Sequence, residues 1–269
     1  MPTRPHTFAA TLRERAGASC GAPAAPDTPT APPAPPALLG LWAGFLTPFA
    51  VEALRGSGLD WLGLDLQHGA LEPPDVAPLL RAADAARTPV LVRVASHDAA
   101  GLARVLDTGP AGVIVPAVES AEQAAALVRA VRHPPHGHRS TGLTRAALTR
   151  GEGPEPEPLL LAMVETAEGL RHAEAIAATP GVDGIFVGPY DLALSLGRTG
   201  TDDPAVVSAV RDALAAARQQ GRIGGLFAGS TALASHLPRV QLLAADTDAA
   251  ALRAGVRRTL DAFRTALDG

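Results

Sequence analysis

Four side chains that could do chemistry stand at or just after the ends of short apolar runs: His68, Arg93, Glu165 and Asp191. In (β/α) barrels, the carboxyl ends of the strands form one face, and the catalytic groups lie there. If the apolar runs are strands of one barrel, two carboxylates, one imidazole and one guanidinium face a common pocket. Such a set can hold a cation, move a proton and stabilise an oxyanion.

The two carboxylates are candidates for a cation site. Glu165 and Asp191 follow successive runs, in MVETAEG and GIFVGPYDLALSLG. Mg²⁺ and Mn²⁺ prefer oxygen ligands, and one or two carboxylates plus water and substrate oxygens often bind them. Either acid could instead cap the helix that follows it, with Thr166 as a further candidate cap. Because the carboxylates pair on one barrel face, we favour the cation site.

His68 and Arg93 are candidates for proton transfer and anion binding. His68 follows a run in DLQHGALEPPD, where a neutral imidazole can act as a base near pH 7, although an ordinary exposed histidine gives the same pattern. Arg93 lies within PVLVRVAS, and a buried guanidinium needs a partner or a polar cavity. It therefore either forms a structural ion pair in the barrel mouth or holds a substrate oxyanion, and we favour the second.

The other histidines and the cysteine are weaker candidates. His133, His136 and His138 resemble a zinc cluster, but their spacing H-P-P-H-G-H belongs to a Pro/Gly turn that leads from a helix into a strand. We do not expect a metal there. Cys20 is the sole cysteine, which excludes an intramolecular disulfide and any zinc or iron–sulfur site built from cysteines.

Eight short apolar runs alternate with segments of helical period. Uninterrupted apolar strands separated by helices are typical of a parallel sheet buried on both faces, and eight such units predict an α/β fold, a closed (β/α)8 TIM barrel. An open doubly wound sheet is the alternative, but it would carry a G-x-G-x-x-G turn after its first strand, and none follows any run. The runs are 38–44, 61–66, 89–94, 112–117, 159–165, 183–188, 223–228 and 240–245, and the expected helices include 72–87, 119–132, 168–178, 204–220 and 247–267.

The N-terminal part of the chain differs from the expected barrel. Residues 7–16, TFAATLRERA, predict a short helix, and residues 17–37 are a low-complexity stretch rich in proline and alanine. We therefore divide the chain into an N-terminal helical segment at 1–16, a Pro/Ala-rich linker at 17–37 and a barrel domain at 38–269.

Composition narrows the possible reactions and partners. All 23 basic residues are arginine, so no lysine can form a Schiff base or carry pyridoxal phosphate. The net charge of −4 argues against a nucleic-acid partner. Residues 28–51 carry no charge, but prolines and glycines interrupt them, so we expect no membrane span. The chain does not begin like a signal peptide, and we expect a cytoplasmic protein.

Six segments together resemble the HpcH/HpaI family of metal-dependent, pyruvate-using class II aldolases: LGLDLQHG, PVLVRVAS, VLDTGPAGVIVPAVESAEQA, HPPHGHRSTG, MVETAEG and GVDGIFVGPYDLALSLG. The resemblance implies reversible cleavage of a 4-hydroxy-2-oxo acid into pyruvate and an aldehyde. A related lyase of CoA esters or a decarboxylase of oxaloacetate-like acids is the alternative within enzymes. A non-catalytic metabolite-binding barrel is the alternative outside them.

The resemblance also implies roles for individual residues. Glu165 and Asp191 would hold a divalent cation, Mg²⁺, Mn²⁺ or Co²⁺, which would take the place of the missing lysine as electron sink. His68 would act as the base, and Arg93 would stabilise the oxyanion. The residues that would contact the substrate are Arg93, Met163, Gly188, Tyr190 and Asp191.

Asp107, in VLDTG, matches a family aspartate that raises the basicity of the catalytic histidine. It ends an expected helix and so lies at the face opposite the pocket. The resemblance therefore implies a homo-oligomer, a trimer or hexamer, in which Asp107 serves the histidine of a neighbouring subunit. A local contact at the helix end is the alternative.

Overall fold

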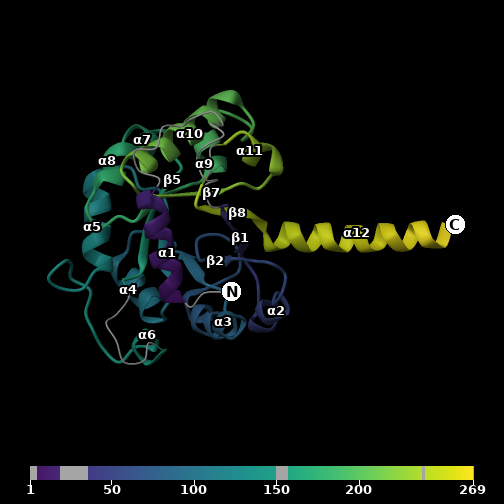
Figure 1. Cartoon of the computed structure of the whole chain (residues 1–269), viewed down its shortest axis with the longest axis horizontal. Helices are drawn as coiled ribbons and strands as arrows, with labels where there is room; N and C mark the ends of the chain where they lie inside the picture. Colours follow the sequence, from purple (N-terminus) through teal and green to yellow (C-terminus); the bar gives the residue numbers. More distant parts are fainter. Residues whose placement is uncertain (1–4, 19–35, 150–156, 238–239, 269) are drawn as a thin grey trace.

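The chain folds into a closed barrel of parallel strands surrounded by helices (Figure 1). The computed structural model describes residues 5–18, 36–149, 157–237 and 240–268. Within these ranges eight strands follow one another in sequence order, each pairs in parallel with its neighbours, and the last closes onto the first. The predicted (β/α)8 TIM barrel is confirmed. The strands are β1 (Leu38–Ala43), β2 (Trp61–Asp65), β3 (Val90–Arg93), β4 (Gly112–Val115), β5 (Leu159–Val164), β6 (Gly184–Val187), β7 (Ile223–Phe227) and β8 (Leu242–Thr247).

The helices begin at residues suited to helix starts. Prolines occupy the first turn of α2, α3, α9 and α10, where the missing N–H is not needed. Side-chain oxygens cap α2, α4, α5, α7, α10 and α11. The helices are α1 (Pro5–Ala18), α2 (Pro48–Ala53), α3 (Pro73–Ala86), α4 (Ala99–Asp107), α5 (Ala121–Val131), α6 (Arg145–Thr149), α7 (Ala167–Arg171), α8 (Ala173–Ala178), α9 (Pro189–Ser195), α10 (Pro204–Gln219), α11 (Thr231–Ser235) and α12 (Asp248–Asp268).

Aromatic side chains fill the interior of the barrel. Trp42 stacks on Phe186 with ring centroids 5.5 Å apart, and Trp61 meets Phe186 edge-on at 6.3 Å. Glycines on neighbouring strands make room for these rings. A Cβ at Gly40 would lie 2.2 Å from Trp61, and a Cβ at Gly225 would lie 2.5 Å from Phe186. The axis is therefore packed, and a functional site has to lie at an end of the barrel.

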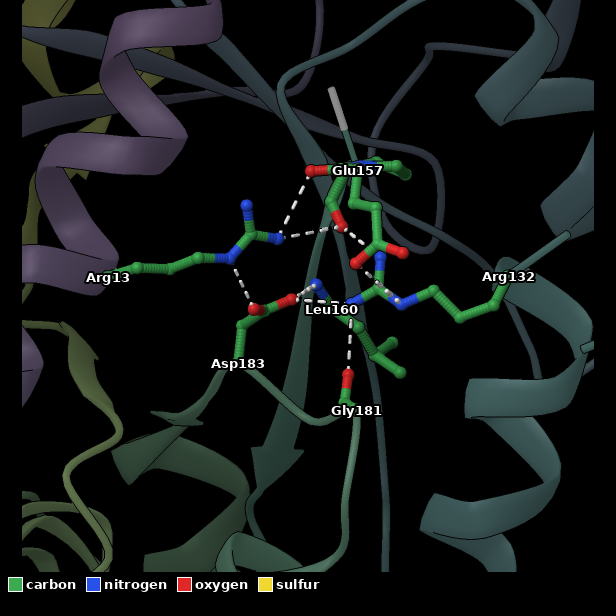
Figure 2. A network of polar contacts seen from close by, with 7 residues as sticks. Arg13, Arg132, Glu157, Leu160, Gly181 and Asp183 are labelled. Atoms are coloured by element: carbon green, nitrogen blue, oxygen red, sulfur yellow. Dashed lines mark hydrogen bonds and ion pairs between the residues drawn. The ribbon is translucent and has the colours of Figure 1, made fainter. Parts of the chain in front are cut away.

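Helix α1 covers the N-terminal ends of the strands. Phe8 is buried in the same core as the inward-facing strand residues. Arg13 Nε donates to Asp183 Oδ1 at 2.7 Å (Figure 2). The other oxygen, Oδ2, accepts from Arg132 Nη2 and from Leu160 N, both at 2.8 Å. This network fixes α1 across one end of the barrel and leaves the carboxyl ends of the strands as the candidate face.

Helix α12 leaves the barrel instead of packing on it (Figure 1). Its large apolar side chains lie on one side of the helix and are 48–83% exposed; we call them the apolar stripe of α12. Among the described residues, α12 therefore does not cover the outer side of β8 and β1, and Leu39 of β1 is 48% exposed. None of the helices in the described ranges is both long and apolar enough to cross a membrane. The stripe comprises Leu252, Val256, Leu260, Phe263 and Leu267.

One predicted helix is interrupted, and the last strand lies later in the sequence than predicted. The helix predicted at 168–178 is two helices, α7 and α8, because the backbone of His172 between them departs from helical geometry. The Nδ1 atom of His172 lies 2.8 Å from the carbonyl oxygen of Glu119, which fixes the break. The last strand begins at Leu242, later than predicted, and extends to Thr247 beside a register shift in β1.

The N-terminal helix is longer than predicted. It spans Pro5–Ala18 rather than residues 7–16, so it includes the first two residues of the expected linker. Residues 36–37 of the linker lead into β1, and residues 19–35 lie outside the described part of the chain.

Candidate active site

An ion pair lies at the carboxyl ends of β2 and β3, where the strand register sets Asp65 directly beside Arg93. Arg93 Nε donates to Asp65 Oδ1 at 2.8 Å, and Nη2 donates to Oδ2 at 2.6 Å. The indole N–H of Trp42 donates to Asp65 Oδ2 at 3.1 Å, and the guanidinium lies 5.2 Å from the centre of the Trp42 ring. Two parallel charge-assisted bonds and an aromatic face hold the buried guanidinium in one orientation.

The two expectations for Arg93 prove compatible. The structural ion pair is present, but it uses only Nε and Nη2. The third nitrogen, Nη1, makes no hydrogen bond to any residue that the structure describes. Arg93 therefore keeps donor capacity for an anion.

Asp65 also organises the loop that carries His68. Its Oδ1 accepts from the backbone N–H of Gln67 at 3.0 Å and of His68 at 3.3 Å. Burial alone would raise the pKa of Asp65, but the hydrogen bonds and charge of Arg93, with these two backbone donors, hold the pKa below its ordinary value of 3.8. His68 is exposed, and its ring has no hydrogen-bond partner in the described ranges. The imidazole is accordingly accessible to a substrate.

Glu165 is a buried carboxylate with one oxygen unsatisfied. Oε1 accepts from Ala117 N at 2.8 Å, whereas Oε2 is buried and has no hydrogen-bond partner among the described residues. Burial raises the pKa of Glu165 from 4.5 to about 7; the Ala117 hydrogen bond opposes this rise, and the negative charge of Asp191 adds to it. Such a group is stabilised by a proton or by a cation.

Asp191 supplies the second carboxylate, exposed in the first turn of α9. The capping alternative is wrong for both acids. Thr166, not Glu165, caps α7 by accepting from Gly169 N at 3.0 Å. Gly188 occupies the N-cap of α9 and has no side chain that could accept.

Three of the predicted side chains, Glu165, Asp191 and Arg93, lie near one another at the carboxyl ends of the strands. The charges of Asp191, Arg93 and Asp65 all influence the pKa of Glu165. The backbone N–H of His68 donates to Asp65 Oδ1, so the loop that carries the fourth predicted residue begins beside this group. No group of three or more His, Cys, Asp or Glu side chains converges as a metal site within the described ranges. A cation bound here would use two carboxylates and further oxygens from water or substrate.

The three other predicted contact residues lie on β5 and at the start of α9, directly after β6. Met163 is buried on β5, and a Cβ at Gly188 would lie 2.6 Å from Met163 Cε and 2.7 Å from Glu165 Oε2. Glycine is therefore required for this close approach of β6 to the carboxylate. Tyr190 is half-exposed, and its ring centroid lies 5.8 Å from that of Phe227 on β7.

Asp107 lies elsewhere, at the end of α4 before β4 begins. Its Oδ1 accepts from Arg139 Nη2 at 3.1 Å, which is the local contact expected as the alternative. His133 Nδ1 lies 2.8 Å from the carbonyl oxygen of the same arginine. Within one chain, the structure does not bring Asp107 to His68.

Sequence reasoning identified the four charged or titratable groups but missed how they are held. Neither Asp65 nor Trp42, which hold Arg93, is among the predicted site residues. A signal was available, because Asp65 ends WLGLD and Arg93 ends VLVR. Opposite charges that end neighbouring buried strands must pair or face a polar cavity.

Comparisons with known proteins agree with this geometry. The sequence profile of the HpcH/HpaI aldolase/citrate lyase family matches residues 38–245. A hydroxypyruvate/pyruvate aldolase of Chromohalobacter salexigens is 38% identical over 237 residues, covering 84% of this chain and 92% of that protein. A 5-keto-4-deoxy-D-glucarate aldolase of Klebsiella pneumoniae is 33% identical over 235 residues, with coverages of 84% and 92%. The crystal structure of an HpcH/HpaI aldolase/citrate lyase family protein of Burkholderia cenocepacia superposes with a TM-score of 0.79 at 36% identity, covering 85% of this chain and 95% of that one.

Proposed function

This chain belongs to the HpcH/HpaI aldolase/citrate lyase family and is an aldolase, and we propose that it uses a divalent cation to cleave 4-hydroxy-2-oxo acids reversibly into pyruvate and an aldehyde. The observation that carries the proposal is the buried Oε2 of Glu165, which lacks a donor and lies within the electrostatic influence of Asp191. Arg93 and His68 on the same face complete the set that an aldol reaction needs.

The donor set fits a hard divalent cation. Glu165 and Asp191 would hold it, since both present carboxylate oxygens and neither caps a helix. Mg²⁺, Mn²⁺ and Co²⁺ are the candidates, with water and substrate oxygens as further ligands. When bound, the cation supplies a Lewis acid that draws electron density from the 2-oxo group of the substrate.

The chain's own residues would handle the proton and the developing charge. His68 accepts the proton of the 4-hydroxyl group, directly or through a water, as the bond between C3 and C4 breaks. The electron pair of that bond moves into the pyruvate fragment. Arg93, held in place by Asp65, donates a hydrogen bond to the oxygen that becomes negative. A proton added at C3 then yields pyruvate, and the other fragment leaves as the aldehyde.

Exchange of the pyruvate methyl protons with solvent deuterium tests this proposal. We expect exchange by the wild-type chain with Mn²⁺, its loss in excess EDTA and its return when Mn²⁺ is restored. Exchange that persists under full chelation would exclude the cation. Because it isolates proton removal from carbon–carbon cleavage, the assay does not depend on knowing the aldehyde.

Mn²⁺ binding tests the ligands without an activity readout. The double variant Glu165→Gln with Asp191→Asn should lose Mn²⁺ binding in calorimetry while its circular dichroism spectrum stays that of the wild type. Glu157→Gln is the matched control, because Glu157 is an exposed acid that interacts with Arg132 at the other end of the barrel. An unchanged Mn²⁺ affinity in the double variant would refute the ligand assignment.

We further propose pyruvate or hydroxypyruvate as the carbon nucleophile. The name of the relative from Chromohalobacter salexigens, a hydroxypyruvate/pyruvate aldolase, supports this choice. A panel of aldehydes offered with each of the two acids, with products separated by mass, would identify the accepted pair. If no addition product formed from either acid with any aldehyde of the panel, the proposed substrate class would be contradicted.

The chain is also proposed to act as a homo-oligomer in which a second copy covers the apolar stripe of α12. A stripe of exposed Leu, Val and Phe along a helix side is typical of an interface. The uncovered outer side of β1 and β8 around Leu39 is its natural counterpart. Reciprocal exchange of α12 between two copies would cover both surfaces in a closed, two-fold arrangement.

A site completed between subunits is the remaining part of the proposal. The Asp107 side chain is 37% exposed beside Arg139, so it can also face a neighbouring subunit. Mixing inactive His68→Ala and Asp107→Ala chains should restore part of the exchange activity, since some sites would then have both residues intact. No recovery in confirmed mixed oligomers would contradict the completion in trans.

A further inference from the structure

Asp248 is a buried carboxylate at the carboxyl ends of the strands that the proposed mechanism does not use. It is 4% exposed and begins α12 directly after β8. Its Oδ2 accepts from the backbone N–H of both Gly44 and Phe45, each at 2.9 Å. Its Oδ1 accepts from Ala249 N at 2.8 Å. The side chain thus joins the end of β8 to the turn that follows β1.

The turn held by Asp248 is in backbone contact with the loop that carries His68. The carbonyl oxygen of Gly44 accepts from Ala70 N at 2.7 Å. Gly69, the residue between His68 and Ala70, has a φ of +104°. A Cβ at Gly69 would lie 2.6 Å from the carbonyl oxygen of Gly44. The contact therefore falls on the residue next to His68, and glycine is needed for it.

We propose that Asp248 is a positioning residue for His68, acting through the turn at Gly44. The loop has two supports: the 3.3 Å bond from His68 N to Asp65, and the contact of Gly69 and Ala70 with Gly44. Asp248 fixes the second support. The inference rests on the proposed role of His68 as the base.

Two variants at position 248 separate positioning from folding. Asp248→Ala removes the acceptor of three backbone N–H groups, whereas Asp248→Asn keeps one oxygen that can accept from both Gly44 and Phe45. At saturating pyruvate and Mn²⁺, we expect Asp248→Ala to slow methyl exchange by about tenfold to a hundredfold per folded chain. The Kd for Mn²⁺ should stay unchanged, and Asp248→Asn should recover most of the rate.

Nuclear magnetic resonance of the His68 ring gives a readout that needs no activity. The ring signals are identified by their absence in His68→Ala. We expect Asp248→Ala to shift them while leaving those of His133, at the other end of the barrel, in place. If Asp248→Ala does not fold, Gly69→Ala makes the same test, because its Cβ forces the loop away from the Gly44 turn.

A control variant at the N-terminal end of the barrel shows what general destabilisation alone does to the exchange rate. Asp183→Ala deletes another carboxylate with several hydrogen bonds (Figure 2) and should lower the melting temperature without slowing exchange. A wild-type chain that catalyses no exchange would contradict the proposed function. Unshifted His68 signals in the position-248 or Gly69 variant would overturn the inference, whatever the activity.

Discussion

At Glu165, a proton and a cation compete for the same carboxylate. Its buried Oε2 has no donor within the described residues, and its pKa is raised to about 7, so near neutral pH the group is poised between the two. Metal binding to a protonated ligand must release the proton, which makes the affinity dependent on pH.

The first prediction concerns stability against pH. An acid whose pKa rises on folding, here from 4.5 to about 7, makes the folded chain bind more protons than the unfolded chain over that range. Without added cation, the free energy of unfolding should therefore fall as pH rises from 4.5 to about 7. Glu165 should account for up to about 3 kcal/mol of this fall. Mn²⁺ should raise the melting temperature more at pH 8 than at pH 5.5. Scanning calorimetry of wild type and Glu165→Gln checks this, and an equal Mn²⁺ effect at both values would contradict it.

The second prediction concerns the buried ion pair. Asp65→Ala leaves the Arg93 guanidinium buried without its partner, and we expect a loss of about 3–5 kcal/mol in urea unfolding. Because the pKa of Asp65 is lowered, this contribution is present above pH 3.8 and disappears as pH falls through the folded pKa.

A double variant distinguishes stability from function at the same pair. Asp65→Leu with Arg93→Met replaces both charges by apolar groups and should recover most of the lost stability. Methyl exchange should nevertheless stay low, since the donor to the oxyanion is gone. Full exchange activity in this variant would show that Arg93 has no role in the reaction.

The chemically active side chains could be chosen from the sequence because each lies at or just after the end of an apolar run. Their supports could be predicted only in part. Opposite charges at the ends of two successive apolar runs indicate that Asp65 and Arg93 need partners, but the strand register that sets them side by side does not follow from the sequence pattern. Asp248 acts on Gly44 across 204 residues of sequence, a separation that no local motif records.

At the scale of elements, the two ends of the barrel have different tasks. The N-terminal end is closed by α1 and the network around Asp183, whereas the carboxyl end carries the loops of His68, Glu165 and Asp191. Substitutions at the N-terminal end should affect stability and not the reaction. In (β/α)8 barrels the residues for stability and those for catalysis usually lie at opposite ends in this way.

The third prediction tests that separation. Arg132 is buried and donates to Pro158 O, Gly181 O and Asp183 at 2.6, 2.9 and 2.8 Å, whereas the Arg13 side chain is 35% exposed. Arg132→Ala should therefore cost about 3 kcal/mol and Arg13→Ala about 1 kcal/mol in urea unfolding. Both variants should keep the wild-type exchange rate per folded chain. Slower exchange in either would show that the two ends are coupled.

Element types were predictable where local patterns decide them. All eight strands were expected within a few residues of their ends because buried parallel strands read as unbroken apolar runs. The break at His172 was not expected, since it depends on a contact with Glu119 from another part of the chain. The direction of α12 was equally hidden, because a helix with one apolar side gives the same pattern whether it covers its own barrel or another surface.

At the scale of the whole molecule, α12 is the element that one chain leaves without a partner. The fourth prediction is that Phe263→Glu dissociates the proposed homo-oligomer, measured by sedimentation at several protein concentrations. Phe263 is 65% exposed within one chain, so the substitution would cost little if α12 stayed free in solution. Thr265→Glu lies on the opposite side of the helix and is the matched control. Equal sedimentation of both variants and wild type would contradict an interface at the stripe.

The ion pair between Arg13 of α1 and Asp183 affects the order in which the chain folds during synthesis. Arg13 and Asp183 are 170 residues apart, so α1 leaves the ribosome without its ion-pair partner until five of the eight strands have been synthesised. Contacts of such long range form late, because the entropy of closing the intervening loop must be overcome first. Until α1 docks, the aromatic interior stays open at one end. Helix α1 is therefore synthesised before all eight strands of the barrel but is among the last elements to reach its final position.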